Sequence, residues 1–101
     1  MNASENSVHL VQLSGPITLY ESNELRETLL LALSEGTDLS VDLETSGPWD
    51  IAGLQLLIAL IASGRKADRR IRFVHVPRVC REIAQRSGLE EWLDSVTDSY
   101  C

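Results

Sequence analysis

The side chains that could carry out chemistry are few and lie far apart in the chain. His9 and His75 each fall in a stretch that alternates apolar and polar residues, which is typical of a strand. Neither has a serine or cysteine partner at a catalytic spacing. The sequence contains no glycine-rich phosphate loop and no Gly-x-Ser-x-Gly turn. We therefore expect no catalytic site, no bound metal and no cofactor.

The composition indicates a cytoplasmic globular protein. The net charge of −6 is a poor match for nucleic acid or an anionic membrane, because binding to either needs clustered lysine and arginine. The longest apolar run, residues 56–62, is far shorter than the roughly 20 residues of a membrane span. The polar N-terminus lacks the pattern of a signal peptide. Cys80 and Cys101 are the only cysteines, and we expect both to be unpaired thiols in a reducing compartment.

One basic patch interrupts this acidic composition. It comprises Arg65, Lys66, Arg69, Arg70 and Arg72. The simplest interpretation is a solvated helix end and loop, with positive charge at the negative end of the helix dipole. The alternative is a local site for an acidic partner surface or for the phosphate of a nucleotide. The patch has no interleaved aromatic residue, which argues against nucleic acid.

The stretch before and after Asp50 has the pattern of a strand, a turn and a helix. Residues 38–43 alternate apolar and polar side chains, as a half-buried strand does, and residues 46–48 are turn formers. Asp50 is placed to cap the following helix, because its carboxylate can accept hydrogen bonds from the free amides of a first turn. Thr45 and Ser46 are nearby hydroxyl residues.

The helix predicted over residues 53–65 has no charged side chain before its last residue. At about 100° per residue, one face holds the expected core residues Leu54, Leu57, Ile58 and Ile61. The opposite face holds Gln55, Leu56, Ala59, Ala62 and Ser63. A helix with no charged face is usually buried on all sides. The second face is therefore either covered by the last helix of the chain or, as we favour, left for a protein partner.

The whole chain predicts an α/β fold, a single domain with a four-stranded mixed sheet flanked by about four helices. A capping-box spacing at Thr18 and Glu21 precedes the first helix. The opening pair of strands, joined through the turn at residues 14–16, would make the sheet mixed. The expected strands lie at 8–13, 16–17, 38–43 and 69–76. The first expected helix follows the capping box and ends near residue 34, and the other three span 53–65, 78–86 and 89–93. The domain would occupy residues 8–96, between tails at 1–7 and 97–101.

Four short segments, in this order, resemble the STAS domain, the family of bacterial anti-sigma-factor antagonists and related modules. They are Leu13-Ser-Gly-Pro-Ile17, Leu39-Ser-Val-Asp-Leu43, Asp50-Ile-Ala-Gly-Leu54 and Arg86-Ser-Gly-Leu89. The resemblance implies a mostly parallel sheet and partner switching through the turn after the central strand. The usual family motif there is Asp-Ser-Ser-Gly or Asp-Ser-Thr-Gly. Its first serine is phosphorylated by a kinase that is also the anti-sigma factor.

This sequence departs from that motif at the residue that matters most. Asp50 and Gly53 match it, whereas Ile51 takes the phosphoacceptor position and Ala52 the second hydroxyl position. Isoleucine has no oxygen to phosphorylate. The resemblance therefore implies a module that binds its partner without this switch, unless a neighbouring hydroxyl such as Thr45 substitutes.

The expected partner-binding surface joins the motif to the uncharged helix face. It comprises Trp49, Asp50, Ile51, Ala52, Gly53, Gln55, Leu56, Ala59 and Ser63. Ile51 and Trp49 would present apolar surface, with the alternatives that Trp49 plugs the loop from inside and that Asp50 acts only as a cap.

Several partners fit the resemblance. The first is an anti-sigma factor with kinase activity, which would place the protein in transcription regulation. The second is the ATPase of a lipid-transport ABC system, where some STAS subunits carry an Asp-Thr-Ala-Gly-like motif. A role in chemotaxis or two-component signalling stays open, as does a homodimer. A nucleotide-binding domain that uses residues 65–72 is the alternative of another class.

Overall fold

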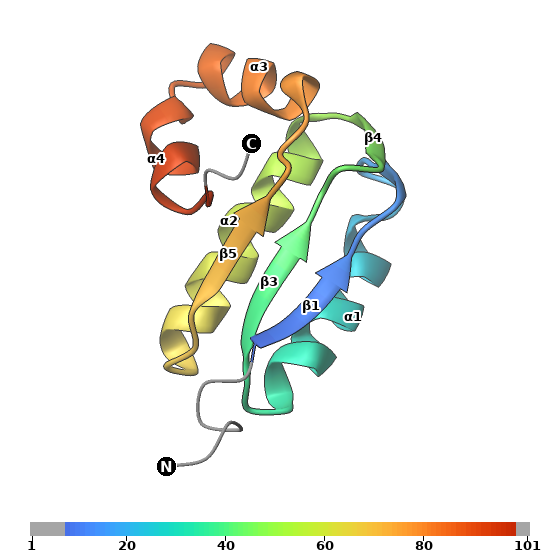
Figure 1. The fold of residues 1–101 in the computed structure, drawn as a ribbon. Coiled ribbons are helices and arrows are strands. Elements are labelled where there is room, and N and C mark those ends of the chain that lie inside the picture. The colour runs from blue at the N-terminus through green and yellow to red at the C-terminus, as the bar shows by residue number, and fades with distance from the viewer. Residues whose placement is uncertain (1–7, 99–101) are drawn as a thin grey trace.

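The computed structural model describes residues 8–98, which form an α/β domain with four helices. Three strands make one sheet in the order β1-β3-β5, and two short strands make a second, β2-β4. The elements are β1 (Val8–Gln12), β2 (Gly15–Ile17), α1 (Ser22–Ser34), β3 (Asp38–Asp42), β4 (Ser46–Trp49), α2 (Ile51–Lys66), β5 (Ile71–Val74), α3 (Arg78–Arg86) and α4 (Glu90–Ser95). The expected α/β class and its flanking helices are confirmed (Figure 1). The single four-stranded sheet that the sequence predicted is instead divided into two sheets, because β4 forms where a turn was expected and pairs with β2.

The strand pairs among these residues are all parallel, which corrects the expected mixed pairing of the opening strands. Gly15 has a left-handed conformation with a φ of 81°, and the chain bends there without reversing. The Leu13 N–H donates to Asp42 O (3.0 Å), and the Gly15 N–H donates to Thr45 O (3.1 Å). The segment from β1 to β2 therefore runs beside the segment from β3 to β4 for its whole length.

Helices α1 and α2 cover one face of the three-stranded sheet (Figure 1). Parallel neighbours need a crossover connection, and each of these helices supplies one. Leu39 and Val41 of β3 are buried on this side and alternate with half-buried polar residues, which confirms the predicted strand pattern. On the opposite face of the sheet, the strand β1 is exposed. Val8 and Leu10 of β1 are 54% and 66% exposed.

Helix α2 is the main covering element of the core. Seven of its residues are buried, against two in α1, two in α3 and one in α4. A Cβ added at Gly64 would lie 2.6 Å from Ile71 Cδ1, so this glycine lets α2 approach β5 closely. Despite this apolar character, no helix within residues 8–98 has the length and hydrophobicity needed to cross a bilayer.

The chain after α4 runs along the outer edge of β5. The Phe73 N–H donates to Val96 O (2.9 Å), and the Asp98 N–H donates to Phe73 O (2.8 Å). Thr97 is only 7% exposed, so packing continues past residue 96, where the sequence placed the start of a tail. The expected tail at 1–7 and the last residues of the expected C-terminal tail, 99–101, lie outside the described residues.

Candidate functional site

The Asp50 carboxylate connects two turns that are far apart in the sequence. Its Oδ1 accepts a hydrogen bond from the Gly53 N–H (3.1 Å) and caps α2, as the sequence predicts. Its Oδ2 accepts from the Leu19 N–H (3.0 Å), 31 positions away. Asp50 therefore fixes the start of α2 and, at the same time, the turn between β2 and α1.

The turn at Leu19 is also held by hydrogen bonds between the residues that flank it, Thr18 and Glu21. The Glu21 carboxylate accepts hydrogen bonds from the backbone N–H (3.0 Å) and the hydroxyl of Thr18. This is one half of the predicted capping box, although α1 itself begins one residue later, at Ser22. The two residues enclosed by this contact face water: Leu19 is 67% exposed and Tyr20 is 91% exposed.

Gly53 lies at the point where α2 packs most closely on the short strands. A Cβ there would lie 2.4 Å from Ile17 O and 2.7 Å from Trp49 Cε3. Gly53 is buried, so it contributes close packing and not contact area for a partner.

Trp49 is 7% exposed, which corrects the expectation that it presents apolar surface. Its indole Nε1–H donates to Ser46 Oγ (2.9 Å), and the Ser46 hydroxyl in turn donates to Leu43 O (2.6 Å). With its polar atom satisfied inside the domain, Trp49 fills the loop beneath the first turn of α2. This is the alternative that the sequence left open.

The water-facing side of α2 is rotated from the one predicted. Leu56, placed on the partner face, is 5% exposed and belongs to the core, whereas Ile58, placed in the core, is half-buried. The buried side is centred nearer Leu57, Leu60 and Gly64, and α2 contacts α1 and the strands β4 and β5. Ile51, at 47% exposure, begins the water-facing side.

Asp50, the turn that it holds and one side of α2 that reaches solvent form a candidate docking surface, which we call the α2 ridge. It comprises Leu19, Tyr20, Asp50, Ile51, Ala52, Gln55, Ala59 and Ser63. Ile51 and Gln55 are exposed, and Ala52, Ala59 and Ser63 are half-buried, so the last helices of the chain do not cover this side of α2. Leu19 and Tyr20 were not predicted, because their place in the ridge depends on the distant contact with Asp50.

Three polar side chains that could carry out chemistry lie close together at one end of the sheet. Asp42, Glu44 and His75 converge at the carboxyl ends of β3 and β5, with ligand atoms within 4.8 Å of one another. The His75 Nδ1 lies 3.2 Å from Asp42 Oδ1, in a pair separated by 33 positions that no local spacing could reveal. Glu44 and His75 are exposed, so water reaches this group of three side chains at the end of the sheet.

The thiol of Cys80 is unsuited to nucleophilic chemistry. Burial in the core raises its pKa to about 12, and the positive charge of Arg81 offsets only part of that rise. The reactive form of cysteine is the thiolate, which is scarce at neutral pH when the pKa is this high.

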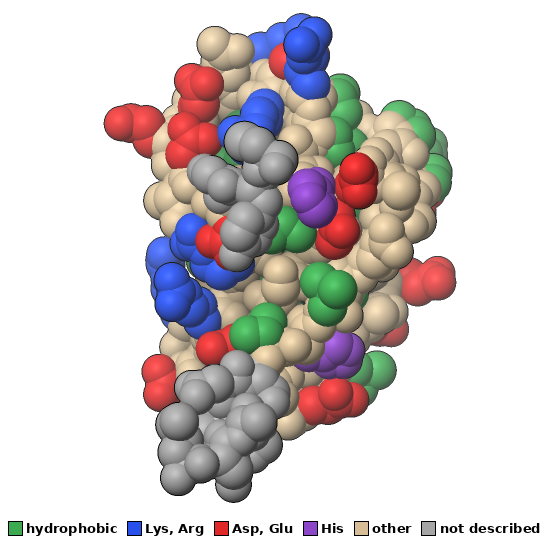
Figure 2. Space-filling model, in the orientation of Figure 1, with side chains coloured by type: hydrophobic (Ala, Val, Ile, Leu, Met, Phe, Trp, Pro, Cys, Tyr) green, Lys and Arg blue, Asp and Glu red, His purple; other side chains and the backbone are tan. Residues whose placement is uncertain are grey.

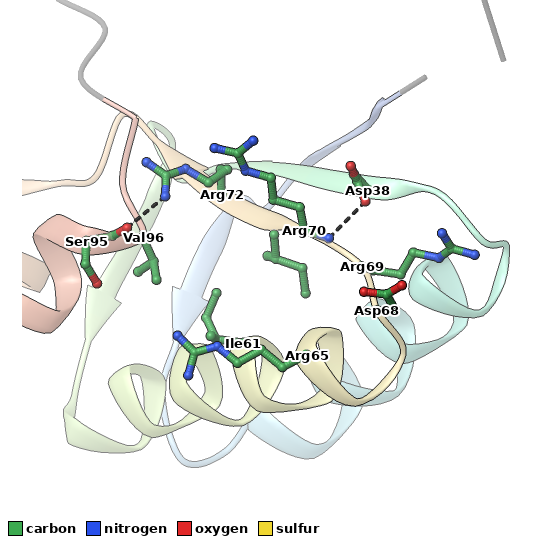
Figure 3. A pocket seen from close by; sticks show the side chains of 10 residues that line it. Asp38, Ile61, Arg65, Asp68, Arg69, Arg70, Arg72, Ser95 and Val96 are labelled. Carbon is green, nitrogen blue, oxygen red and sulfur yellow. Dashed lines mark hydrogen bonds between the residues drawn. The ribbon is translucent and has the colours of Figure 1, made fainter. Parts of the chain in front are cut away.

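The basic residues of the stretch 65–72 begin in the last turn of α2, at the opposite end of the helix from Asp50 and Ile51. Four of these arginines line a hollow where α2 ends and β5 begins (Figure 3). The hollow therefore lies at the end of α2 that is opposite to Asp50 and Ile51.

Comparison with known proteins decides the family. The model of a family described as "Mlab, STAS domain" matches residues 1–96. The chain belongs to the STAS family.

Several solved structures share the fold of this domain at low sequence identity. A sulfate transporter family protein from Wolinella succinogenes is similar with a TM-score of 0.71 and 16% identity, covering 95% of this chain and 83% of its own. The STAS domain of a SulP transporter from Vibrio cholerae gives a TM-score of 0.63 and 15% identity over 89% of this chain and 71% of its own.

The unphosphorylated anti-sigma factor antagonist SpoIIAA is also similar. Its TM-score is 0.62 at 16% identity, over 79% of this chain and 74% of its own. No curated protein matches the sequence. At these identities the likeness to solved structures establishes the fold of this STAS domain.

Proposed function

We propose that this STAS domain is a non-catalytic regulatory module that docks on a protein partner through the α2 ridge. The observation that carries the proposal is the exposure of apolar side chains around a rigid centre. Leu19, Tyr20 and Ile51 are 67%, 91% and 47% exposed, and the Asp50 carboxylate holds the backbone beside them. Fixed aliphatic and aromatic side chains that face water are typical of protein-binding surfaces.

We further propose that docking is independent of phosphorylation. Ile51 corresponds to the residue that is phosphorylated in anti-sigma-factor antagonists, and its side chain has no phosphate acceptor. A phosphate there would add about −1.5 to −2 charges to the surface. The neighbouring hydroxyls are poor substitutes, because Ser46 Oγ is bonded to Leu43 O and Trp49 Nε1, and Thr45 Oγ1 lies 2.7 Å from Ser14 Oγ.

The partner that we place first is a cytoplasmic anti-sigma factor of the kinase type, so that the module would act in bacterial transcription regulation. The alternative is the ATPase of a lipid-transport ABC system. A permanent subunit of this kind needs no phosphate switch, so it too would accommodate Ile51 and Ala52, which have no hydroxyl.

The experiment compares two matched substitutions against the partner isolated from the native organism. Ile51→Asp puts a charge in the ridge, and Leu31→Asp puts the same charge on the 70%-exposed Leu31, at the far end of α1. Ile51 is the first residue of α2, where a carboxylate suits the helix dipole, so the fold should be retained. We expect Ile51→Asp to weaken binding roughly thirtyfold, the effect of losing a hot-spot contact of about 2 kcal/mol.

Leu31→Asp should bind like the wild type. Equal affinity of the two variants would contradict the ridge as the docking site. Whether the isolated partner is a kinase-type regulator or a transport ATPase separates the two candidate functions.

A further inference from the structure

The two edges of the three-stranded sheet differ in what covers them. β5 forms one edge and β1 forms the other (Figure 1). The outer edge of β5 is paired with the segment after α4: the Phe73 N–H donates to Val96 O (2.9 Å), and the Asp98 N–H donates to Phe73 O (2.8 Å). Within residues 8–98, no strand pairs with the outer edge of β1. An unpaired edge presents free backbone N–H and C=O groups to another strand.

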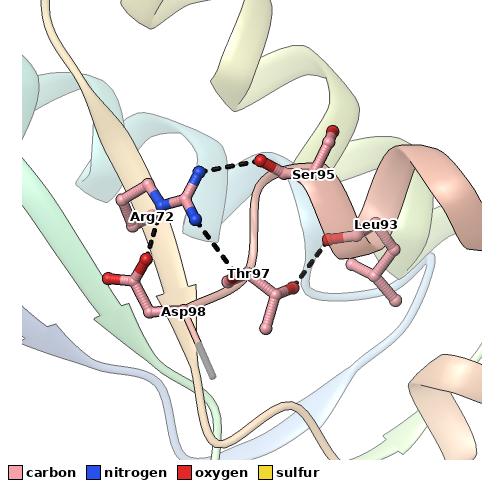
Figure 4. Close-up of polar contacts among 5 residues, drawn as sticks. All are labelled: Arg72, Leu93, Ser95, Thr97 and Asp98. Atoms are coloured by element: carbon pink, nitrogen blue, oxygen red, sulfur yellow. Dashed lines mark hydrogen bonds and ion pairs between the residues drawn. The ribbon is translucent and has the colours of Figure 1, made fainter. Parts of the chain in front are cut away.

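The cover over β5 is fixed by the guanidinium of Arg72 (Figure 4). Its Nε donates to Asp98 Oδ1 (2.7 Å), its Nη1 to Ser95 O (2.7 Å) and its Nη2 to Thr97 O (3.0 Å). These contacts hold the segment after α4 against β5, so a strand of another molecule would have to displace it before adding at this edge. Of the two edges, β1 is therefore the one available for pairing.

β1 has none of the features with which natural proteins block an edge strand. Those features are charged side chains, proline, and bulges that twist the edge away. β1 (Val8–Gln12) contains no lysine, arginine, aspartate, glutamate or proline, and its register with β3 is regular over all 5 residues. Hydrophobic side chains reach the surface over β1 (Figure 2), where Val8 and Leu10 are 54% and 66% exposed. An exposed apolar edge of this kind is a place where strands of separate chains pair.

The register of β1 shows which of its backbone groups face outward. The Leu13 N–H donates to Asp42 O (3.0 Å), which directs this N–H toward β3. The backbone groups of successive strand residues point to opposite sides, so those of His9 and Val11 also face β3. The alternate residues, whose N–H and C=O groups face the open edge, are Val8, Leu10 and Gln12.

The charge of the chain favours β1 as a contact between two copies. Each chain has a net charge of −6, so two copies repel each other unless they meet where charge is absent. The only histidine in β1 is His9, whose Nδ1 lies 3.5 Å from Glu35 Oε1 of the same chain. Contact along β1 therefore brings no like charges opposite each other.

We propose that two copies of this chain pair through antiparallel β1 strands, which joins their sheets into one continuous sheet. A twofold axis at Leu10 places this residue opposite its counterpart in the second copy, and Val8 opposite Gln12 of the second copy. The outward-facing N–H and C=O groups of all three residues then form hydrogen bonds. The leucine pair adds apolar contact on the face away from the helices.

Assembly stops at the dimer. A twofold contact uses the same edge of both copies, and the segment after α4 covers the other edge of each sheet. This pairing is independent of docking at the α2 ridge, because β1 contributes no residue to the ridge.

Sedimentation equilibrium of the full chain, from about 10 μM to about 1 mM, tests the proposal. We expect a monomer–dimer equilibrium with a dissociation constant on the order of 10–100 μM, because a contact made by one strand pair is smaller than a standard interface. Leu10→Lys places two like charges opposite each other and should weaken the dimer by at least about tenfold. Leu19→Lys is the matched control: it makes the same change at a leucine that is 67% exposed on the α2 ridge, and it should leave the dimer unaltered.

A proline variant tests the backbone pairing separately. Proline lacks an N–H, but the Leu10 N–H faces away from β3, so Leu10→Pro retains the hydrogen bonds between β1 and β3. We expect this variant to be folded, as checked by circular dichroism, and to dimerise at least about tenfold more weakly than the wild type.

Amide hydrogen exchange locates the interface. Raising the protein concentration from about 10 μM to about 1 mM should slow exchange at Leu10 and Gln12. The amides of His9 and Val11 face β3 and should exchange slowly at both concentrations. A chain that stays monomeric at about 1 mM overturns the proposal. A dimer that Leu19→Lys weakens and Leu10→Lys does not, or one that leaves exchange at Leu10 and Gln12 unchanged, also overturns it.

Discussion

Replacing Asp50 with alanine removes both acceptors that connect the start of α2 to the turn before α1. Loss of an N-cap costs about 1 kcal/mol, and loss of a hydrogen bond to a charged group costs about 1.5 kcal/mol. The two contacts are those with the Gly53 N–H (3.1 Å) and the Leu19 N–H (3.0 Å). We therefore expect Asp50→Ala to lower the free energy of unfolding by about 2–3 kcal/mol, measured by urea denaturation.

Asp50→Asn separates the two contributions. Asparagine is also a good N-cap, but it has a single acceptor oxygen and cannot serve Gly53 and Leu19 together. We expect Asp50→Asn to cost about 1–1.5 kcal/mol. Amide exchange should accelerate at Leu19 in both variants and at Gly53 only in Asp50→Ala. If Asp50→Ala stays within about 0.5 kcal/mol of the wild type, or if both variants are equally unstable, this reasoning is refuted.

Two further outcomes follow from buried positions. Gly53→Ala places a Cβ 2.4 Å from Ile17 O and should destabilise the domain by about 1–3 kcal/mol, seen as a lower thermal midpoint; an unchanged midpoint would contradict the close packing. In Cys101→Ser, the remaining thiol of Cys80 should react with a disulfide reagent at pH 8 about a thousandfold more slowly than a free cysteine, because its pKa is raised from 9.0 to about 12. A rate within tenfold of free cysteine would contradict its burial. Since this pKa is higher in the folded state, its contribution to stability is complete below pH 9.0 and is lost as the pH rises toward 12.

Features set by local spacing were predictable from the sequence. The alternation in residues 38–43 predicted β3 and its buried side, and Asp50 was predicted as the cap of α2. The order of helices and strands, with the segment Asp50–Leu54 at a helix start, pointed to the STAS family, which the family match confirms.

Features set by contacts between distant residues were not predictable. The path from β1 to β2 depends on Gly15, whose φ of 81° bends the chain without reversing it. The exposed turn at Leu19 joins the ridge through Asp50, 31 positions away, and Arg72 holds Asp98 across 26 positions. No short motif carries such pairings.

The two errors on α2 have a different cause. The helix has so few charged residues that its hydrophobic pattern does not define one face, and the predicted core side was rotated away from Leu60. Leu56, predicted on the surface, consequently lies in the core, and Ile58, predicted in the core, is half-buried. The burial of Trp49 follows from its hydrogen bond to Ser46, which sequence spacing alone permits but does not require.

The central claim is that a protein partner covers the α2 ridge. Hydrogen exchange measured on the full chain, with and without the isolated partner, locates the covered surface directly. We expect slower exchange at residues 18–22 and 51–59. Exchange should be unchanged at residues 27–34 of α1 and at residues 65–72, which run from the last turn of α2 into β5. Protection confined to the open face of the sheet or to the basic hollow, with none at the ridge, would contradict the account.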